Sequence, residues 1–214
     1  MSFRRPRRPR RPRRAPLLPW LALLLIAFAV FAFPRLGTFL LVSEDPIPSD
    51  TTFLSYGVSI RRAALDSAID RYRGGQSSSI LLGALKSRDA AHYITPHSSD
   101  LARQYLLDAG IPATAIEVLP SVDSEREEAD CLRTALASHA WQRVVAYVPD
   151  FRARRSAGVL KRAVSSLTPA VDLRVVAVRD PEVQLERWWQ TRPGLNVIWN
   201  EYPRLAYYAL RGWL

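Results

Sequence analysis

Three closely spaced arginines are the strongest candidates for chemistry in this sequence. Arg152, Arg154 and Arg155 follow residues 143–148, an apolar run typical of a buried strand, and they begin a stretch with helical periodicity. The start of a helix attracts anions through its exposed N–H groups and its dipole, and guanidinium groups add donors that fit phosphate or carboxylate oxygens. The pattern indicates an anion-binding site, although solvated arginines paired with nearby carboxylates would produce the same pattern.

Further polar or small residues lie where other strands are predicted to end. Arg62, or its neighbour Arg61, begins the first predicted helix of the domain and could join the three arginines. Gly57 and Gly83 follow the first two predicted strands, where the lack of a side chain lets the backbone approach a ligand closely. Ser124 is placed to cap a later helix and to face the same edge of the sheet.

A short acidic run follows that serine. Glu125, Glu127 and Glu128 fall within the first turn of the predicted helix. Paired carboxylates can perform general acid–base catalysis, which makes Glu128 a weak catalytic candidate. Acidic residues at this position more often stabilise the helix dipole. No Gly-x-Ser-x-Gly motif is present, so the sequence does not indicate a serine nucleophile of that type.

Metal and cofactor sites are not predicted. His92, His97 and His139 are scattered and lack the spacing of metal ligands. The one cysteine, Cys131, cannot form an intramolecular disulfide and lies beside the apolar stripe of its predicted helix, so we expect a partly buried, inert thiol.

Short apolar runs alternate with helical patterns along the domain. The predicted strands are 51–55, 79–82, 115–119, 143–148 and 173–178, and the predicted helices are 61–72, 98–109, 124–139, 153–166, 181–190 and 195–210. Alternation of this kind, with strands that are apolar throughout, is typical of a parallel sheet covered on both faces. We therefore predict an α/β fold, a Rossmann-like three-layer sandwich with a mainly parallel sheet, in which ligands bind beyond the carboxyl ends of the strands.

The N-terminal residues predict a membrane anchor with a defined direction. Residues 1–14 carry eight arginines in Arg-Arg-Pro repeats, and residues 15–34 are uncharged and mostly apolar. A helix of that length would cover roughly 30 Å, the thickness of a hydrocarbon core. Because arginine-rich flanks stay in the cytoplasm, we predict a single-pass inner-membrane protein whose domain is extracytoplasmic. A cleaved signal peptide is the alternative.

The tail explains the basic composition. Eight of the positive charges behind the formal net charge of +10 lie in it, so the remaining chain carries about +2 and has no nucleic-acid footprint. Residues 35–47 are predicted to be a connector, with 36–42 apolar enough to lie along the membrane surface. Residues 48–214 are predicted to form one domain.

The last quarter of the chain is rich in aromatic residues. They could meet lipid headgroups, with Trp213 and Leu214 as the first candidates for lipid contact, or they could pack two closing helices onto the sheet. The aromatic residues concerned are Trp188, Trp189, Trp199, Tyr202, Tyr207, Tyr208 and Trp213.

Five segments of the domain occur in the order of a known family's motifs. They are Gly110-Ile111-Pro112, Ser124-Glu125-Arg126-Glu127-Glu128-Ala129, Tyr147 to Ser156, Trp188-Trp189 with Arg192 and Gly194, and Glu201 to Tyr208. Together they resemble the YdcF/SanA/ElyC family of bacterial envelope proteins over about 46–214. The resemblance implies a YdcF-like domain with a role in cell-envelope maintenance, near peptidoglycan or its phosphorylated lipid carrier.

Departures from that family pattern fall at its polar positions. Arg152 stands where the family usually has His, and Glu125 where it usually has Thr. The glycine pairs after the first two strands are reduced to Gly57 and Gly83. If the family uses that His in acid–base chemistry, this chain has lost it, which argues against catalysis.

The expected function is binding of an anionic ligand, through Arg154 and Arg155 above all, by a membrane-anchored envelope protein. The expected partners are membrane lipid, through residues 15–34, and an anionic small molecule or lipid-carrier phosphate, with no nucleic acid. The first alternative is a phosphoester or pyrophosphate hydrolase that uses Glu128. The second is a non-catalytic scaffold that binds another envelope protein through the aromatic closing helices.

Overall fold

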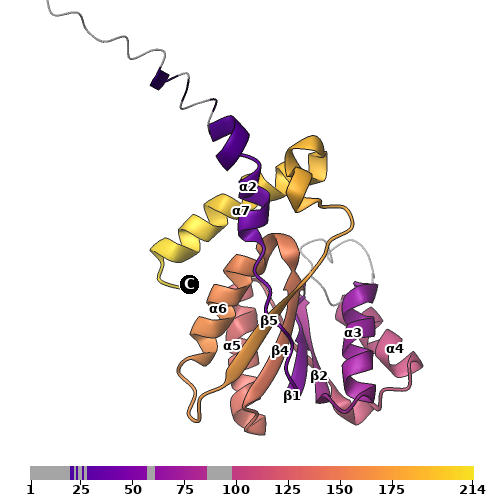
Figure 1. Ribbon diagram of the computed structural model, residues 1–214. Coiled ribbons are helices and arrows are strands. Elements are labelled where there is room, and N and C mark those ends of the chain that lie inside the picture. Colours follow the sequence, from indigo (N-terminus) through magenta and orange to yellow (C-terminus); the bar gives the residue numbers. More distant parts are fainter. Residues whose placement is uncertain (1–19, 22, 24–25, 27, 57–60, 86–97) are drawn as a thin grey trace, which may run out of the picture.

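A five-stranded, all-parallel sheet forms the centre of the molecule (Figure 1). The computed structural model describes residues 20, 21, 23, 26, 28–56, 61–85 and 98–214. The strand order is β3-β2-β1-β4-β5. Their bounds are β1 Ser49–Leu54, β2 Ser77–Leu85, β3 Ile116–Val122, β4 Arg143–Pro149 and β5 Asp172–Val178. The predicted α/β class and parallel sheet are confirmed.

Helices cover both faces of this sheet (Figure 1). One face carries α3 (Arg62–Arg73) and α4 (Ser98–Asp108), and the other carries α5 (Glu125–His139) and α6 (Ala153–Val164). Alternate residues of a strand point to opposite faces, so Val144, Ala146 and Val148 enter the α5–α6 core while Val145 and Tyr147 enter the α3–α4 core. Burial on both sides explains why β4 is apolar throughout.

The start of α5 follows its sequence signals. Ser124 Oγ accepts a hydrogen bond from the Glu127 N–H at 3.2 Å, and Glu127 Oε2 accepts one from the Asp123 N–H at 3.0 Å. The predicted cap is confirmed. These bonds fix the first turn of α5, and with it the position of Glu128 at the carboxyl edge of the sheet.

The closing region differs from its prediction. Residues 181–184 are not helical, and only the short 3₁₀ helix η4 (Leu185–Gln190) forms before α7 (Arg192–Leu210). Figure 1 shows α7 beyond the carboxyl end of the sheet rather than over one of its faces. It contacts η4 and the 3₁₀ helix η3 (Asp150–Arg152).

Residues 35–47 pack on the domain. The short helix α2 (Arg35–Leu40) buries Leu40, and a Cβ added to Gly37 would overlap the Leu185 carbonyl oxygen. Only glycine allows this close approach to η4. Farther on, the Glu44 N–H donates to the Val175 carbonyl at 2.8 Å, which covers the exposed edge of β5. Gly37 and Leu40 therefore face protein, whereas Phe39 and Leu41 are exposed. The placement of 36–42 along the membrane surface stays a prediction.

Residues 1–19 and several positions up to 27 lie outside the described part of the chain, and they include nine of the twenty residues of the predicted span. Of the helices that are described, none combines the length and the apolar character needed to cross a bilayer.

Candidate functional site

The order of the strands marks the end of the sheet at which folds of this kind bind ligands. From β1 the chain builds outward through β2 and β3, and then crosses to the other side of β1 to build β4 and β5. The connections after β1 and β4 therefore leave in opposite directions, and sheets of this kind bind ligands beyond the carboxyl ends of two such strands. Ser55 and Tyr56 follow β1 there, and η3 follows β4. We call this place the switch-point site.

Glu128 reaches into the switch-point site from α5. Its side chain is fully buried, Oε2 accepts a hydrogen bond from Ser55 Oγ at 2.9 Å, and Oε1 accepts one from the Tyr56 N–H at 2.7 Å. Burial raises the pKa of Glu128, although the charge of Arg152 and these two hydrogen bonds oppose the shift. Glu128 thus joins α5 to the end of β1.

Gly83 makes room for that carboxylate. A Cβ built on Gly83 would overlap Glu128 Oε1 and would lie 2.8 Å from the Tyr56 amide nitrogen. The pairing of β2 with β3 also shifts register between Leu82 and Ala84, so the strand bends at this residue. The glycine therefore serves the Glu128 contact, whereas the sequence suggested close approach to a ligand.

Arg152 is the cation of the switch-point site. Its side chain is buried, Nη2 donates to Ser55 Oγ at 2.9 Å, and the guanidinium lies 4.1 Å from the ring centroid of Tyr56. Its Nε is buried and has no hydrogen-bond partner within the described part of the chain. An unpaired buried donor costs about 1–3 kcal/mol, so this N–H would gain from a partner that the described residues do not supply.

The other two arginines of the predicted cluster point elsewhere. Arg155 is buried, and its Nε and Nη2 each donate to a carboxylate oxygen of Glu201 at 2.9 Å while Nη1 pairs with Glu125. Arg154 donates from Nε to the Phe39 carbonyl at 2.5 Å and stacks on that ring. Arg155 thus ties α6 to α5 and α7, and Arg154 ties α6 to α2. Their contacts leave Arg152 as the arginine of the trio that lies at the switch-point site.

The remaining predicted residues are dispersed. Arg62 is exposed and donates to the Tyr105 hydroxyl at 3.2 Å. Its neighbour Arg61 instead pairs with Asp180 at 2.5 Å, close to the carboxyl ends of the strands. Ser124 is occupied as the cap of α5. Gly57 lies outside the described residues.

Two buried aspartates beside the switch-point site, Asp150 and Asp180, were not selected from the sequence. Asp150 Oδ1 accepts hydrogen bonds from the Phe151 N–H at 2.8 Å and the Asp180 N–H at 3.3 Å, and both carboxylates are buried. Burial raises the pKa of Asp150 to about 6, and the charge of Asp180 adds to the shift. Their position in the sequence could have identified them as site residues, because each aspartate comes within two residues of the end of an apolar strand.

Asp150 should make stability depend on pH. Because its pKa is higher in the folded chain than the ordinary 3.8, the folded state keeps a proton that the unfolded state releases. Stability should therefore fall as pH rises from about 4 to about 6, by as much as about 3 kcal/mol. Asp150→Asn removes this loss, so urea unfolding should show the variant gaining on the wild type between pH 4 and pH 7. An equal difference between the two proteins at both pH values would contradict the assignment.

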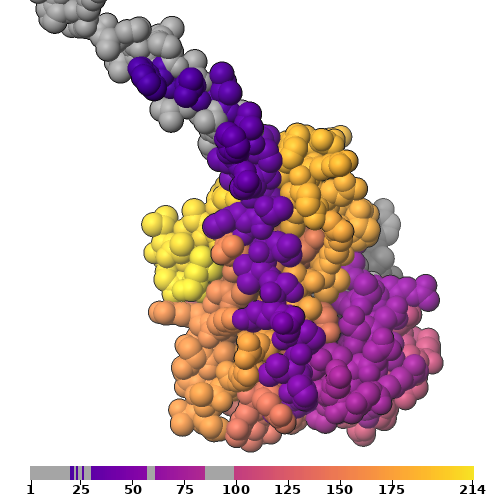
Figure 2. Space-filling view, in the orientation of Figure 1, coloured from indigo at the N-terminus to yellow at the C-terminus, as the bar shows by residue number. Residues whose placement is uncertain are grey.

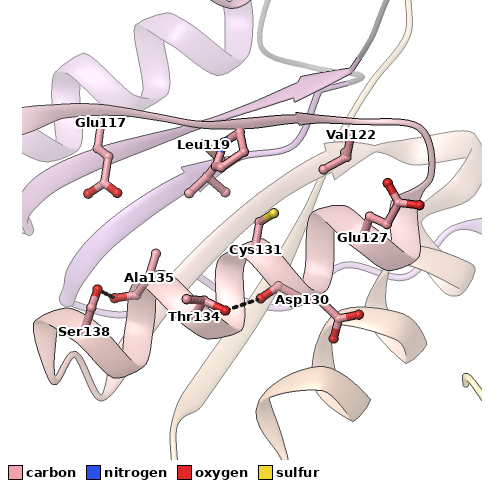
Figure 3. Close-up of a pocket in the computed structure, with 10 residues that line it drawn as sticks. Glu117, Leu119, Val122, Glu127, Asp130, Cys131, Thr134, Ala135 and Ser138 are labelled. Atoms are coloured by element: carbon pink, nitrogen blue, oxygen red, sulfur yellow. Dashed lines mark hydrogen bonds between the residues drawn. The ribbon is translucent and has the colours of Figure 1, made fainter.

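A separate groove of about 520 Å³ lies between β3 and α5 (Figure 3). Leu119 and Val122 line it from the strand, and Cys131 points into it from the helix. Burial and neighbouring carboxylates raise the pKa of the Cys131 thiol, which keeps it protonated and poorly nucleophilic. This groove lies at the sheet edge, away from the switch point.

In the part of the chain that is described, no three His, Cys, Asp or Glu side chains are grouped so that they could hold a metal ion.

Neither a scan against models of known protein families nor a search of curated proteins found a match to this chain. The resemblance to the YdcF/SanA/ElyC family stays a prediction.

Proposed function

We propose that this protein is a membrane-anchored envelope protein whose α/β domain binds the phosphate or carboxylate group of an anionic ligand at the switch-point site. The observation that carries the proposal is Arg152, a buried arginine at the ligand-binding end of the fold, whose Nε has no partner among the residues that the structure describes. A guanidinium offers several donors in a fixed plane, and Ser55 Oγ uses one of those of Arg152. An anion would accept from the free Nε.

The charges around Arg152 favour a bound anion when Glu128 is protonated. Glu128 faces Arg152, and its raised pKa means that burial works against its negative charge. A protonated Glu128 would leave the positive charge of Arg152 uncompensated. Anion binding should therefore be accompanied by proton uptake.

Ligand binding can be tested with the full chain in detergent micelles. The probes are inorganic phosphate, pyrophosphate and a short polyprenyl phosphate, and the measurement is the unfolding temperature. A probe at a hundred times its dissociation constant should stabilise the protein by about 2.7 kcal/mol, a shift of a few degrees. Arg152→Gln should abolish the shift. Arg162→Gln, which removes an exposed arginine on α6, should retain it.

The conservative change keeps this test decisive. Arg152→Lys preserves the charge but lacks the Nε donor, so it should bind more weakly than the wild type while keeping its fold. Equal shifts in wild type, Arg152→Gln and Arg152→Lys would contradict the proposal. So would the absence of any shift in the wild type.

Hydrolysis of a phosphoester or pyrophosphate is the second candidate. The observation in its favour is Asp150, whose pKa of about 6 suits proton transfer near neutral pH. Inorganic phosphate released from pyrophosphate in the same samples, and lost in Asp150→Asn, would favour catalysis over binding alone.

A further inference from the structure

Helix α7 leaves an apolar stripe without a protein partner in the described part of the chain. Its inner side is buried through Gly194, Ile198 and Glu201. The other side exposes apolar residues that recur every three or four positions, as on one face of a helix. They are Leu195, Trp199, Pro203, Ala206 and Leu210, with Trp199 76% and Leu210 88% exposed. Tryptophan and leucine are unusual in so exposed a row, which marks the stripe as a contact surface.

The chain that leads to the predicted span is fixed beside this stripe. The Phe33 ring lies 4.6 Å from that of Trp188, and the Tyr202 hydroxyl of α7 donates to the Leu36 carbonyl at 2.9 Å. Figure 2 shows the N-terminal segment rising directly from the domain surface between the regions of α7 and η4. No free linker separates Phe33 from the domain, so a bilayer around residues 15–34 would lie next to α7.

We propose that the stripe of α7 lies in the headgroup region of the bilayer that holds residues 15–34, so that the domain is docked on the membrane in a fixed orientation. The inference rests on the anchor of the proposed function. Tryptophan favours the boundary between lipid and water, and an amphipathic helix buries its apolar face there. Arg192 and Arg204 are exposed on the same helix, and Arg211 is exposed directly after it; together they supply charge complementary to anionic headgroups. Phe39 of α2 and the adjacent Leu41 continue the exposed apolar surface onto the segment that leads to the predicted span.

Quenching by lipids tests this placement in the full chain. In a Cys131→Ser background, single cysteines replace Trp199 on the stripe, the adjacent Asn200 off the stripe, and Phe31 in the predicted span. Each variant carries a bimane label and is reconstituted into vesicles of phosphatidylethanolamine and phosphatidylglycerol, with or without lipids bearing a nitroxide near the headgroup. The label at 31 should be quenched, the label at 199 should be quenched at least twofold more than that at 200, and removing phosphatidylglycerol should weaken the effect at 199.

The three positions separate the possible failures. Quenching at 31 but equally weak quenching at 199 and 200 would overturn the docking of α7 and leave the anchor intact. No quenching at 31, with the protein not retained in the vesicles, would overturn both the anchor and this inference. Substitution of Leu210 by cysteine provides a second stripe position, which must behave as 199 does.

Discussion

Replacing Arg155 with methionine should lower the free energy of unfolding by about 3–5 kcal/mol, because the change leaves two buried carboxylates without their cation. Glu125 and Glu201 are only 3% exposed, and Arg155 bridges them from α6. Without it, Glu125 has no cationic partner among the described residues and Glu201 keeps only the largely exposed Arg204, 3.6 Å away, so two buried charges lose most of their compensation. Urea unfolding of the full chain in micelles measures the loss, which should be accompanied by weaker attachment of α7 in hydrogen exchange.

Two comparison variants distinguish this ion-pair network from general disruption of α6. Arg154→Met removes the adjacent, partly exposed arginine and should have a much smaller effect, within about 1 kcal/mol. The triple change Arg155→Met, Glu125→Gln and Glu201→Gln removes all three charges and should recover part of the stability. If Arg155→Met and Arg154→Met were equally mild, Arg155 would not be a central tie of the fold.

Glu128→Ala should be about as damaging, at about 3–5 kcal/mol, because it leaves Arg152 as a buried charge without its counter-charge. It also removes the acceptors of the Ser55 hydroxyl and the Tyr56 N–H. Glu128→Gln keeps the size and one acceptor, and should destabilise less. Both variants are measured by urea unfolding at pH 7.

Gly83→Ala should disturb the position of the Glu128 carboxylate from the side of β2. The new methyl group would overlap the Glu128 carboxylate, so the variant should lose about 1–3 kcal/mol. Combined with Glu128→Ala, it should cost less than the sum of the single changes, since the overlapping group is gone. Strict additivity would show that Gly83 matters for another reason.

Much of the fold was predictable because its signals are local. The strands of a covered parallel sheet are apolar on both faces, which is visible in 143–148, and the start of α5 carries a serine followed three residues later by a glutamate. The packing of Gly37 and Leu40 on the domain was not predictable, because an apolar residue that faces protein cannot be distinguished by its type from one that faces lipid. The weak helical pattern at 181–190 likewise did not reveal that only η4 would form.

The end of the sheet that carries the proposed site could be predicted from the sequence, but the residues that form the site could not. Arg152 lies in η3, before the regular turns of α6, and reaches Ser55. Arg154 and Arg155 are successive residues of α6 and point about 100° apart, so one meets Phe39 and the other Glu201. Glu201 is 46 residues from Arg155, and only tertiary structure brings the two together. The role of Gly83 also depends on Glu128, a contact between distant elements that no local pattern encodes.

A crystal of the full chain grown with tungstate, a phosphate mimic with strong anomalous scattering, would test the switch-point site most directly. The proposal predicts an anomalous peak within hydrogen-bond reach of Arg152 Nε, and none in crystals of Arg152→Gln grown in the same way. A peak elsewhere on the domain that persists in Arg152→Gln, with the switch-point site empty in both proteins, would contradict the assignment of this site.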